Sequence, residues 1–473
     1  MNNQDTICAI ATAQGGAIGI IRVSGAEAIT IADRIFTPVG NHAISLTERK
    51  PYTLAFGNIK NEQGEIVDEV LVSVFHSPHS YTGEDSVEIS CHGSSFILQH
   101  VMQLLIKNGC RAAGPGEYTQ RAFLNGKMDL SQAEAVADLI ASTSAASHHM
   151  AINQMRGSFS RELSALRDKL LHLTSLMELE LDFSDHEELE FADRTEFQSV
   201  AAQIENVISK LANSFSLGNA IKNGIPVAII GETNAGKSTL LNQLVGEERA
   251  IVSDIHGTTR DVIEDVVNIN GTDFRFIDTA GIRKTSDEIE NLGIERTFKK
   301  TRQAEIILLL IDATCAERQL HALMPQVLNL CDGKHLIIVF NKIDLISSFV
   351  PTLPTDIAET LQNVLSESPI LASISAKTGD GISDLRQKLT SFINLSLSST
   401  DDVIVSNVRH YNALTAALDA IHRVQQSFAT DVPTDLISID LHDCLDNLAE
   451  ITGGSIETDE VLGNIFKHFC IGK

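Results

Sequence analysis

The sequence has no long hydrophobic run, no basic leader and no closely paired cysteines. No stretch of 18 or more apolar residues occurs among its 473 residues, which excludes a transmembrane helix. The first five residues form neither a basic n-region nor an apolar h-region, so we expect a cytoplasmic protein rather than an exported one. The seven cysteines are scattered without a Cys-x-x-Cys pair, which indicates reduced thiols rather than disulfides or a zinc site.

Basic residues are also scarce. The 36 Lys and Arg face 62 Asp and Glu, and the resulting net charge of −26 argues against a protein that holds nucleic acid by its overall field. The nearest approach to a basic block is Arg296, Lys299, Lys300 and Arg302, whose spacing is typical of the polar face of one helix. Any nucleic-acid substrate would therefore need a local basic patch or a basic partner.

The most informative feature that is present is a phosphate loop. The residues from Gly231 to Thr239 read Gly-Glu-Thr-Asn-Ala-Gly-Lys-Ser-Thr, between an apolar run at 225–230 and a helix-like segment at 240–244. Backbone N–H groups of such a loop surround nucleotide phosphates, while Lys237 would reach the β and γ oxygens and Ser238 would hold Mg²⁺. An ordinary strand-to-helix turn is the alternative that this pattern leaves open.

Three later motifs, each after an apolar run, indicate a guanine-nucleotide site. In the first motif, Asp278 can bind Mg²⁺ through water, and Gly281 can present its N–H to the γ-phosphate. In the second motif, the Asp344 carboxylate can accept hydrogen bonds from both N1–H and the exocyclic amine of guanine, a pairing that adenine cannot offer. The third motif would support the base from the other side. These motifs are Asp278-Thr279-Ala280-Gly281, Asn341-Lys342-Ile343-Asp344 and Ser375-Ala376-Lys377.

The site lacks the glutamine that orients the attacking water in Ras-type GTPases, because Ile282 stands at that position. Another group must therefore position water and neutralise charge in the transition state. Asn234 lies inside the phosphate loop, where its side-chain oxygen could hold a monovalent cation beside the phosphates. The acidic run from Asp287 to Glu290 could orient water, although a solvated loop or helix start explains it equally well.

The chain resembles the MnmE (TrmE) family of GTPases, which modify tRNA uridine to its 5-carboxymethylaminomethyl form. The resemblance runs essentially end to end. It implies a homodimer, a heterotetramer with the FAD- and NADH-dependent partner MnmG, tRNA as substrate, and a 5-formyl- or methylene-tetrahydrofolate cofactor besides K⁺ and Mg²⁺. The motifs that carry it are Asn234, Gly257-Thr258-Thr259-Arg260-Asp261, Tyr81-Thr82-Gly83-Glu84-Asp85, Gly114-Pro115-Gly116-Glu117-Tyr118-Thr119, Phe123-Leu124-Asn125-Gly126-Lys127 and Cys470-Ile471-Gly472-Lys473.

The resemblance also implies the role of each site residue. The catalytic candidates are Glu290, Arg260 and Cys470. The Mg²⁺ ligands would be Ser238 and Thr259, the K⁺ ligands Asn234, Ser253, Ile255 and Thr258, and the folate contacts Arg22, Glu84, Lys127 and Lys473. The GTP contacts would be Asn234, Ala235, Gly236, Lys237, Ser238, Thr239, Ser253, Asp254, Ile255, His256, Gly257, Thr258, Thr259, Asp278, Thr279, Ala280, Gly281, Asn341, Lys342, Asp344, Ser375, Ala376 and Lys377.

Patterning along the chain predicts a multidomain protein. Alternating apolar runs at 1–122 indicate an α+β domain, for which the resemblance implies folate binding. Ala/Leu/Glu-rich segments at 123–223 and 397–473 predict the two parts of an all-α domain. An α/β P-loop GTPase domain at 224–396 is inserted between them.

Helical spacing in the two all-α segments predicts one apolar stripe through Leu166, Leu170, Leu173 and Leu176-Met177, and another through Val408, Leu414, Ala417-Leu418 and Ile421. Two functions remain to be weighed. The first is a tRNA-modifying enzyme in which GTP turnover drives a folate-dependent step at the wobble uridine. The second is a regulatory or ribosome-assembly GTPase, which would need neither a folate-like domain nor a Cys-Ile-Gly-Lys tail.

Overall fold

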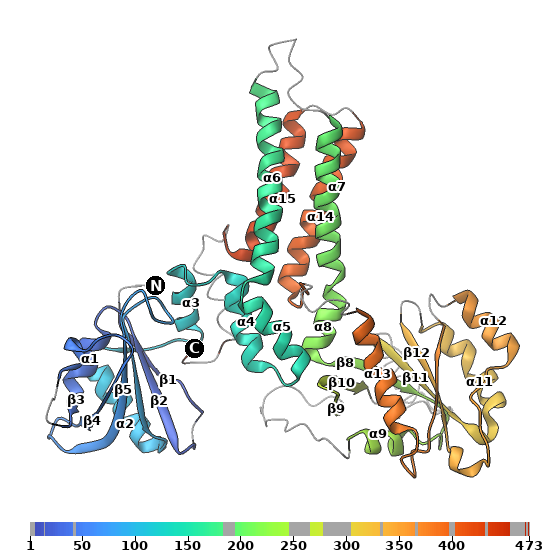
Figure 1. Cartoon of the computed structure of the whole chain (residues 1–473), viewed down its shortest axis with the longest axis horizontal. Coiled ribbons are helices and arrows are strands. Elements are labelled where there is room, and N and C mark those ends of the chain that lie inside the picture. Colours follow the sequence, from blue (N-terminus) through green and yellow to red (C-terminus); the bar gives the residue numbers. More distant parts are fainter. Residues whose placement is uncertain are drawn as a thin grey trace, which may run out of the picture. The chain divides into compact units, whose positions relative to one another are not determined.

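The computed structural model describes residues 5–13, 15–40, 44–182, 194–245, 265–277, 304–331, 334–364, 368–396, 403–430, 434–454, 469 and 472. The chain divides into two compact units. The first comprises Met1–Ile140, Asn153–Ile204 and Asp419–Lys473, and the second comprises Ala141–Ile152 and Glu205–Leu418. The first unit contains a seven-stranded sheet and the second a six-stranded sheet (Figure 1).

The sheet of the first unit has the order β3-β4-β5-β6-β2-β1-β7 and is antiparallel except for the pair β1–β7. Alternation along β5 places Val70, Val72 and Val74 in the core, where helices α1 and α2 cover one face of the sheet (Figure 1). The elements are β1 (Ile7–Ile10), β2 (Ile18–Ser24), α1 (Ala28–Ile35), β3 (Phe36–Pro38), η1 (Leu46–Glu48), β4 (Thr53–Lys60), β5 (Ile66–Phe75), β6 (Ser86–His92), α2 (Ser95–Lys107) and β7 (Arg111–Ala112).

Helices dominate the segments that flank the second sheet in sequence. Helix α6 packs against α15 through the predicted stripe, in which Leu166, Leu170 and Leu173 are buried. On α14 the buried residues include Leu414, but Val408 at its first position is 56% exposed, so placing Val408 on the buried face was wrong. These helices are α3 (Glu117–Leu124), α4 (Leu130–Ala141), α5 (Ala145–Met155), α6 (Ser158–Asp182), α7 (Arg194–Asn213), α8 (Phe215–Asn223), α14 (Val408–Ala429) and α15 (Thr434–Thr452).

The sheet of the second unit has the order β13-β12-β11-β8-β10-β9, and only β9 runs antiparallel to its neighbour. Helices α8, α9 and α13 pack on one face, and α11 and α12 on the other. The elements are β8 (Ile225–Ile230), α9 (Lys237–Val245), β9 (Asp265–Ile269), β10 (Thr272–Ile277), β11 (Ile306–Asp312), η2 (Ala313–Cys315), α11 (Ala316–Leu328), β12 (His335–Asn341), η3 (Ile343–Leu345), α12 (Thr355–Val364), β13 (Ile370–Ser373) and α13 (Ile382–Ser396).

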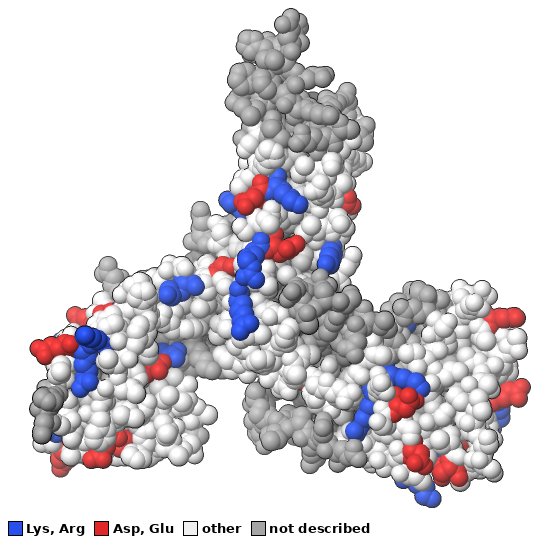
Figure 2. All heavy atoms as spheres, in the orientation of Figure 1, with Lys and Arg blue, Asp and Glu red and all other residues white. Residues whose placement is uncertain are grey.

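This architecture confirms the predicted fold class, while the bounds of the four predicted segments remain predictions. Parallel strands end at one edge of a sheet, so the segments after β8, β11, β12 and β13 meet there. No helix in the described part of the chain is long and apolar enough to cross a membrane. On the face drawn in Figure 2, described Lys and Arg side chains lie interspersed with Asp and Glu rather than forming one broad basic field.

Candidate functional site

The phosphate loop joins the buried strand β8 to helix α9, as its sequence predicts. Asn234 and Gly236 both have left-handed backbone conformations, with φ values of 66° and 100°. A Cβ atom at Gly236 would lie 2.2 Å from Asn341 Nδ2, so only glycine fits there. Lys237 Nζ donates to Gly231 O at 2.7 Å and thus lies folded over the loop.

Asn341 fastens the phosphate loop to the end of the sheet. Its side chain is buried, with 2% exposure, at the last position of β12. Asn341 Nδ2 donates to Ala235 O at 2.7 Å, and Asn341 Oδ1 accepts from Ala376 N at 2.9 Å. The asparagine of the second guanine motif therefore binds both the phosphate loop and the third motif, which explains why three distant segments share one site.

The remaining base-site residues form two further pairs. Ser375 Oγ donates to Asp344 Oδ1 at 2.7 Å, which orients the carboxylate expected to contact guanine. Lys342, with a φ of 67°, donates through Nζ to Asp312 Oδ2 at 2.6 Å. Burial opposes ionisation of Asp312, but the hydrogen bonds from Lys342 and Thr314 outweigh it and lower the pKa of this carboxyl.

These contacts surround a pocket of about 450 Å³. Its lining combines a cationic, N–H-rich end at the phosphate loop with the Asp344 carboxylate, which suits a molecule carrying phosphates and a donor-bearing base. The hydroxyl of Ser238 offers a hard oxygen to Mg²⁺ and Asn234 an amide oxygen to K⁺. The lining residues are Asn234, Gly236, Lys237, Ser238, Thr239, Asn341, Lys342, Asp344, Leu345, Ala376 and Lys377.

Several expected contacts lie outside the described residues, so their roles stay predictions. They include all three catalytic candidates, one of the two expected Mg²⁺ ligands and three of the four expected K⁺ ligands. The residues concerned are Ser253, Asp254, Ile255, His256, Gly257, Thr258, Thr259, Arg260, Asp278, Thr279, Ala280, Gly281, Ile282, Glu290, Cys470 and Lys473.

Three polar residues beside the pocket were missed by the sequence analysis. Asp312 is the last residue of the apolar strand β11. A carboxylate at the end of an apolar run is the same signal that singled out Asp278, and it could have identified Asp312 as well. Gln319 is buried on α11, and Glu232 lies in the phosphate loop itself. Gln319 Nε2 donates to Glu232 Oε2 at 2.9 Å, a contact between residues 87 positions apart that no local pattern predicts.

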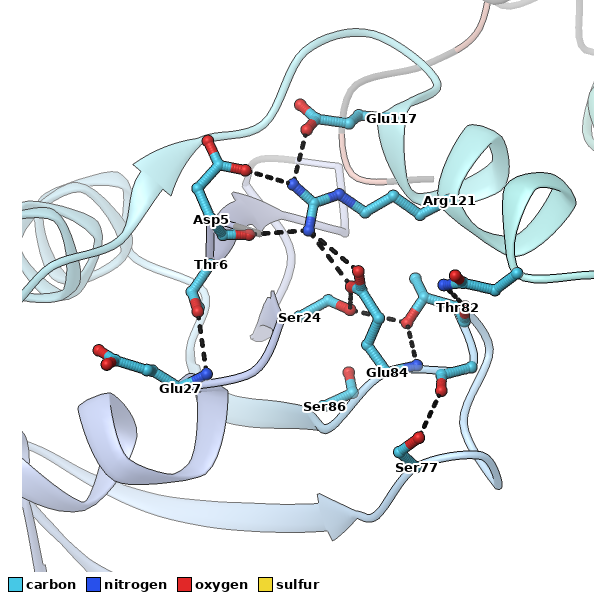
Figure 3. A network of polar contacts seen from close by, with 12 residues as sticks. Asp5, Thr6, Ser24, Glu27, Ser77, Thr82, Glu84, Ser86, Glu117 and Arg121 are labelled. Atoms are coloured by element: carbon cyan, nitrogen blue, oxygen red, sulfur yellow. Dashed lines mark hydrogen bonds and ion pairs between the residues drawn. The ribbon is translucent and has the colours of Figure 1, made fainter. Parts of the chain in front are cut away.

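A second polar centre lies in the N-terminal sheet domain, around the buried guanidinium of Arg121 (Figure 3). Arg121 NH2 donates to Asp5 Oδ1 at 2.7 Å and to Glu117 Oε1 at 3.0 Å. Its NH1 donates to both carboxylate oxygens of Glu84, at 3.2 and 3.3 Å. Glu84 also accepts from Ser24 Oγ at 2.8 Å. Arg121 was not predicted, since a basic residue on a helix ordinarily faces solvent.

Of the three expected folate contacts that the structure describes, Glu84 alone lines a cavity of about 840 Å³, together with Asp5, Glu27, Asp85 and Asn125 among others. Arg22 lies on β2, where its Nε donates to Glu88 Oε1 at 2.9 Å and its NH2 forms an ion pair with the same oxygen at 2.8 Å. Lys127 Nζ donates to Pro78 O at 3.0 Å. Arg22 and Lys127 are not among the described residues lining this cavity.

The fit to a folate is therefore partial. The carboxylates at the cavity suit the N–H donors of a pterin, although Glu84 would have to share its charge with Arg121. A glutamate tail would need a cation from outside the described lining of this cavity. Arg22 lies 5.4 Å from the Tyr81 ring centroid and donates to Gly472 O at 3.5 Å, which brings the C-terminal segment next to one of the expected contacts.

Comparison with known proteins assigns the chain to a family. A model described as "MnmE helical domain" matches residues 130–470, and one described as "GTP-binding protein TrmE N-terminus" matches residues 6–127. The tRNA modification GTPase MnmE of Bacteroides fragilis is 62% identical over 471 residues, covering 100% of both chains. That of Phocaeicola vulgatus is 59% identical over 506 residues, again covering 100% of both. The chain belongs to the MnmE family.

Membership in the MnmE family makes the chain a tRNA modification GTPase and confirms the resemblance on which the sequence analysis relied. Among solved structures, a GTP-binding protein from Sulfolobus solfataricus in complex with GDP covers 49% of this chain and 67% of its own, at 18% identity and a TM-score of 0.30. MnmE family members thus supply the assignment, while the pocket geometry shows which of the expected nucleotide contacts lie together.

Proposed function

We propose that the chain binds GTP in the 450 Å³ pocket and hydrolyses it there. The observation that carries this proposal is the double attachment of Asn341, which ties the phosphate loop and the Ser375–Lys377 segment around one cavity. In this arrangement Lys237 and the loop N–H groups bind the phosphates, and Asp344 accepts from guanine. Ser238 and Thr259 hold Mg²⁺, which neutralises phosphate charge.

The hydrolysis serves tRNA modification at the wobble uridine. We propose that the product carries a carboxymethylaminomethyl group on C5, whose one-carbon unit comes from a tetrahydrofolate derivative bound by the N-terminal domain. The proposal includes a homodimer, assembled with the FAD-containing partner MnmG, acting in the cytoplasm where tRNA is found. Membership in the MnmE family and the acceptor-rich cavity at Glu84 support these assignments.

The guanine assignment is tested with Asp344→Asn. Xanthine carries a carbonyl where guanine carries its amine, and the asparagine amide can donate to that carbonyl. GTP affinity should fall by roughly 10²-fold through loss of a charged acceptor, while affinity for XTP rises. Titration with fluorescent nucleotide analogues measures both values. Asp356→Asn, an exposed carboxylate on α12, is the matched control. Unchanged GTP affinity in Asp344→Asn would remove the basis of the assignment.

The substrate class is tested in cells. Mass spectrometry of tRNA nucleosides from cells lacking this chain should show the C5 modification missing from the wobble uridine. Complementation by Asp344→Asn should fail, because the variant binds little GTP. A normal nucleoside profile in the deletion strain would favour the regulatory or ribosome-assembly alternative.

A further inference from the structure

A continuous set of hydrogen bonds connects the base side of the nucleotide pocket to the phosphate loop. Lys342 Nζ donates to Asp312 Oδ2 at 2.6 Å, and the backbone N of the same Asp312 donates to Gln319 Oε1 at 2.8 Å. Gln319 Nε2 then donates to Glu232 Oε2 at 2.9 Å. These four residues come from the segment directly after β12, from β11, from α11 and from the phosphate loop, so the connection crosses from one segment of the site to the other.

The chemistry at the centre of this connection requires an amide. Gln319 is 4% exposed, and one end of its side chain meets an N–H donor while the other meets a carboxylate. A glutamate would set two carboxylates against each other, and a leucine would take the acceptor away from Asp312 N and a donor away from Glu232. Because both partners fix which end is oxygen and which is nitrogen, Gln319 has a single productive orientation.

The two partners of Gln319, Asp312 and Glu232, each connect to a part of the nucleotide pocket. Glu232 belongs to the loop whose later residues Asn234 and Gly236 have left-handed conformations, so fixing its carboxylate restrains a strained turn. Arg318 NH2 also reaches Glu232 Oε2, at 3.3 Å, but Arg318 is 72% exposed and holds it weakly. At the other end, Asp312 holds Lys342, which lines the pocket.

We propose that Gln319 is a positioning residue that sets the phosphate loop and Lys342 at the separation guanine nucleotides require. The proposal rests on the proposed function, because it assumes that this pocket binds GTP. Preorganisation lowers the cost of ordering the site on binding, so losing it weakens nucleotide affinity without touching the reacting atoms. We expect Gln319→Glu to raise the Kd for GDP and the KM for GTP about tenfold or more, with kcat changed little.

A reciprocal exchange distinguishes positioning from simple damage to the fold. In the double variant Gln319→Glu with Glu232→Gln, residue 319 still accepts from Asp312 N and the amide at 232 donates to it, so the bond returns with its direction reversed. Affinity should recover to within a few fold of the wild-type value. Gln326→Glu adds the same charge at an exposed position of α11 and should leave affinity unchanged.

The measurements are the Kd of a fluorescent GDP analogue and the kcat and KM of GTP hydrolysis. They are made on the full-length wild type, the single variants Gln319→Glu and Glu232→Gln, the double variant and the Gln326→Glu control. A coupling between the two substitutions supports the proposal. Wild-type affinity in Gln319→Glu, or a double variant no better than Gln319→Glu alone, overturns it. A wild-type protein that binds no guanine nucleotide overturns the proposed function instead, so the two failures are distinguishable.

Discussion

Thr143 Oγ1 donates a hydrogen bond to Asp273 Oδ2 at 2.6 Å, joining the segment between α4 and α5 to strand β10 across 130 positions of sequence. Two neighbouring contacts strengthen the junction. Ala146 N donates to Gly271 O at 3.1 Å, and Asn268 Nδ2 donates to the other Asp273 oxygen at 2.7 Å. The hairpin of β9 and β10 is thereby held against a helical segment of the same compact unit.

Removing the Thr143 hydroxyl should loosen this hairpin. Asp273 is 5% exposed, so Thr143→Val leaves a buried carboxylate oxygen without its donor, at a cost of about 1–3 kcal/mol. Hydrogen exchange measured by mass spectrometry should become faster in peptides covering 266–277. Thr360→Val, at an exposed position on α12, should leave those peptides unchanged. Equal protection in wild type and Thr143→Val would mean that the other contacts suffice.

Local patterning predicted much of the fold and of the nucleotide site. One apolar run ends in the phosphate loop and another in Asn341, which predicts two parallel strands ending at the same edge of a sheet. Strands β8 and β12 belong to one sheet and end at the same edge. What it missed depends on contacts between distant segments. Arg121 reads as an ordinary helix-surface cation until Asp5, Glu84 and Glu117 converge on it. Val408 is apolar, but at 3.6 residues per turn it lies on the side of α14 opposite Ala417 and Ile421, and its side chain is exposed.

The Arg121 network should make the N-terminal domain sensitive to acid. Burial alone would raise the pKa of Glu117, but hydrogen bonds from Arg111, Gly114 N and Arg121 outweigh it, so this pKa lies below its ordinary value. A carboxyl whose pKa is depressed in the folded state contributes stability above its unfolded pKa of about 4.3, and loses it as the pH falls through the folded value. Stability should therefore decline below about pH 4.

The variant Glu117→Gln tests the assignment of this acid sensitivity. The amide cannot ionise, so its unfolding midpoint should be lower near neutral pH and should change less between about pH 2 and 5 than that of the wild type. Glu62→Gln, at an exposed ion pair with Lys107, provides the control. Chemical unfolding followed by circular dichroism gives the midpoints. Parallel pH profiles for wild type and Glu117→Gln would assign the acid sensitivity to other carboxyls.

The phosphate-loop asparagine leads to a prediction about monovalent cations. Asn234 lines the pocket and offers an amide oxygen, and the family resemblance adds Ser253, Ile255 and Thr258 as K⁺ ligands. A K⁺ ion there would supply the positive charge that an arginine finger supplies elsewhere. GTP turnover should be much faster in KCl than in NaCl at equal ionic strength, and Asn234→Ala should lose most of that difference. Equal wild-type rates in the two salts would rule the ion out.

Ile282 cannot orient a water molecule, and the family resemblance gives that role to Glu290. Glu290→Ala should lower kcat by on the order of 10²-fold while leaving GTP affinity nearly unchanged. Single-turnover hydrolysis and nucleotide titration separate the two effects. Glu288→Ala, in the same acidic run, serves as the matched comparison. A loss of affinity as large as the loss of rate would make Glu290 a structural residue.

The two ends of the chain are predicted to act together. Gly472 O accepts from Arg22 NH1 at 3.5 Å, and a Cβ atom at Gly472 would lie 2.6 Å from Ile10 O, so Gly472 lies close against strands of the N-terminal sheet. Its φ of 95° also favours glycine. Deleting residues 470–473 removes Cys470 and Lys473 together with this contact. We expect the deletion to abolish tRNA modification and weaken folate binding.

GTP hydrolysis in K⁺ should persist in the same deletion variant, because the described lining of the 450 Å³ pocket comes from residues between Asn234 and Lys377. Nucleoside analysis, folate titration and GTP turnover on one preparation separate these outcomes. Gly472→Ala isolates the close approach, since it keeps the thiol of Cys470 and the charge of Lys473 but crowds Ile10. If the truncated protein modified tRNA at the normal rate, the tail would serve packing alone and Cys470 would have no catalytic role.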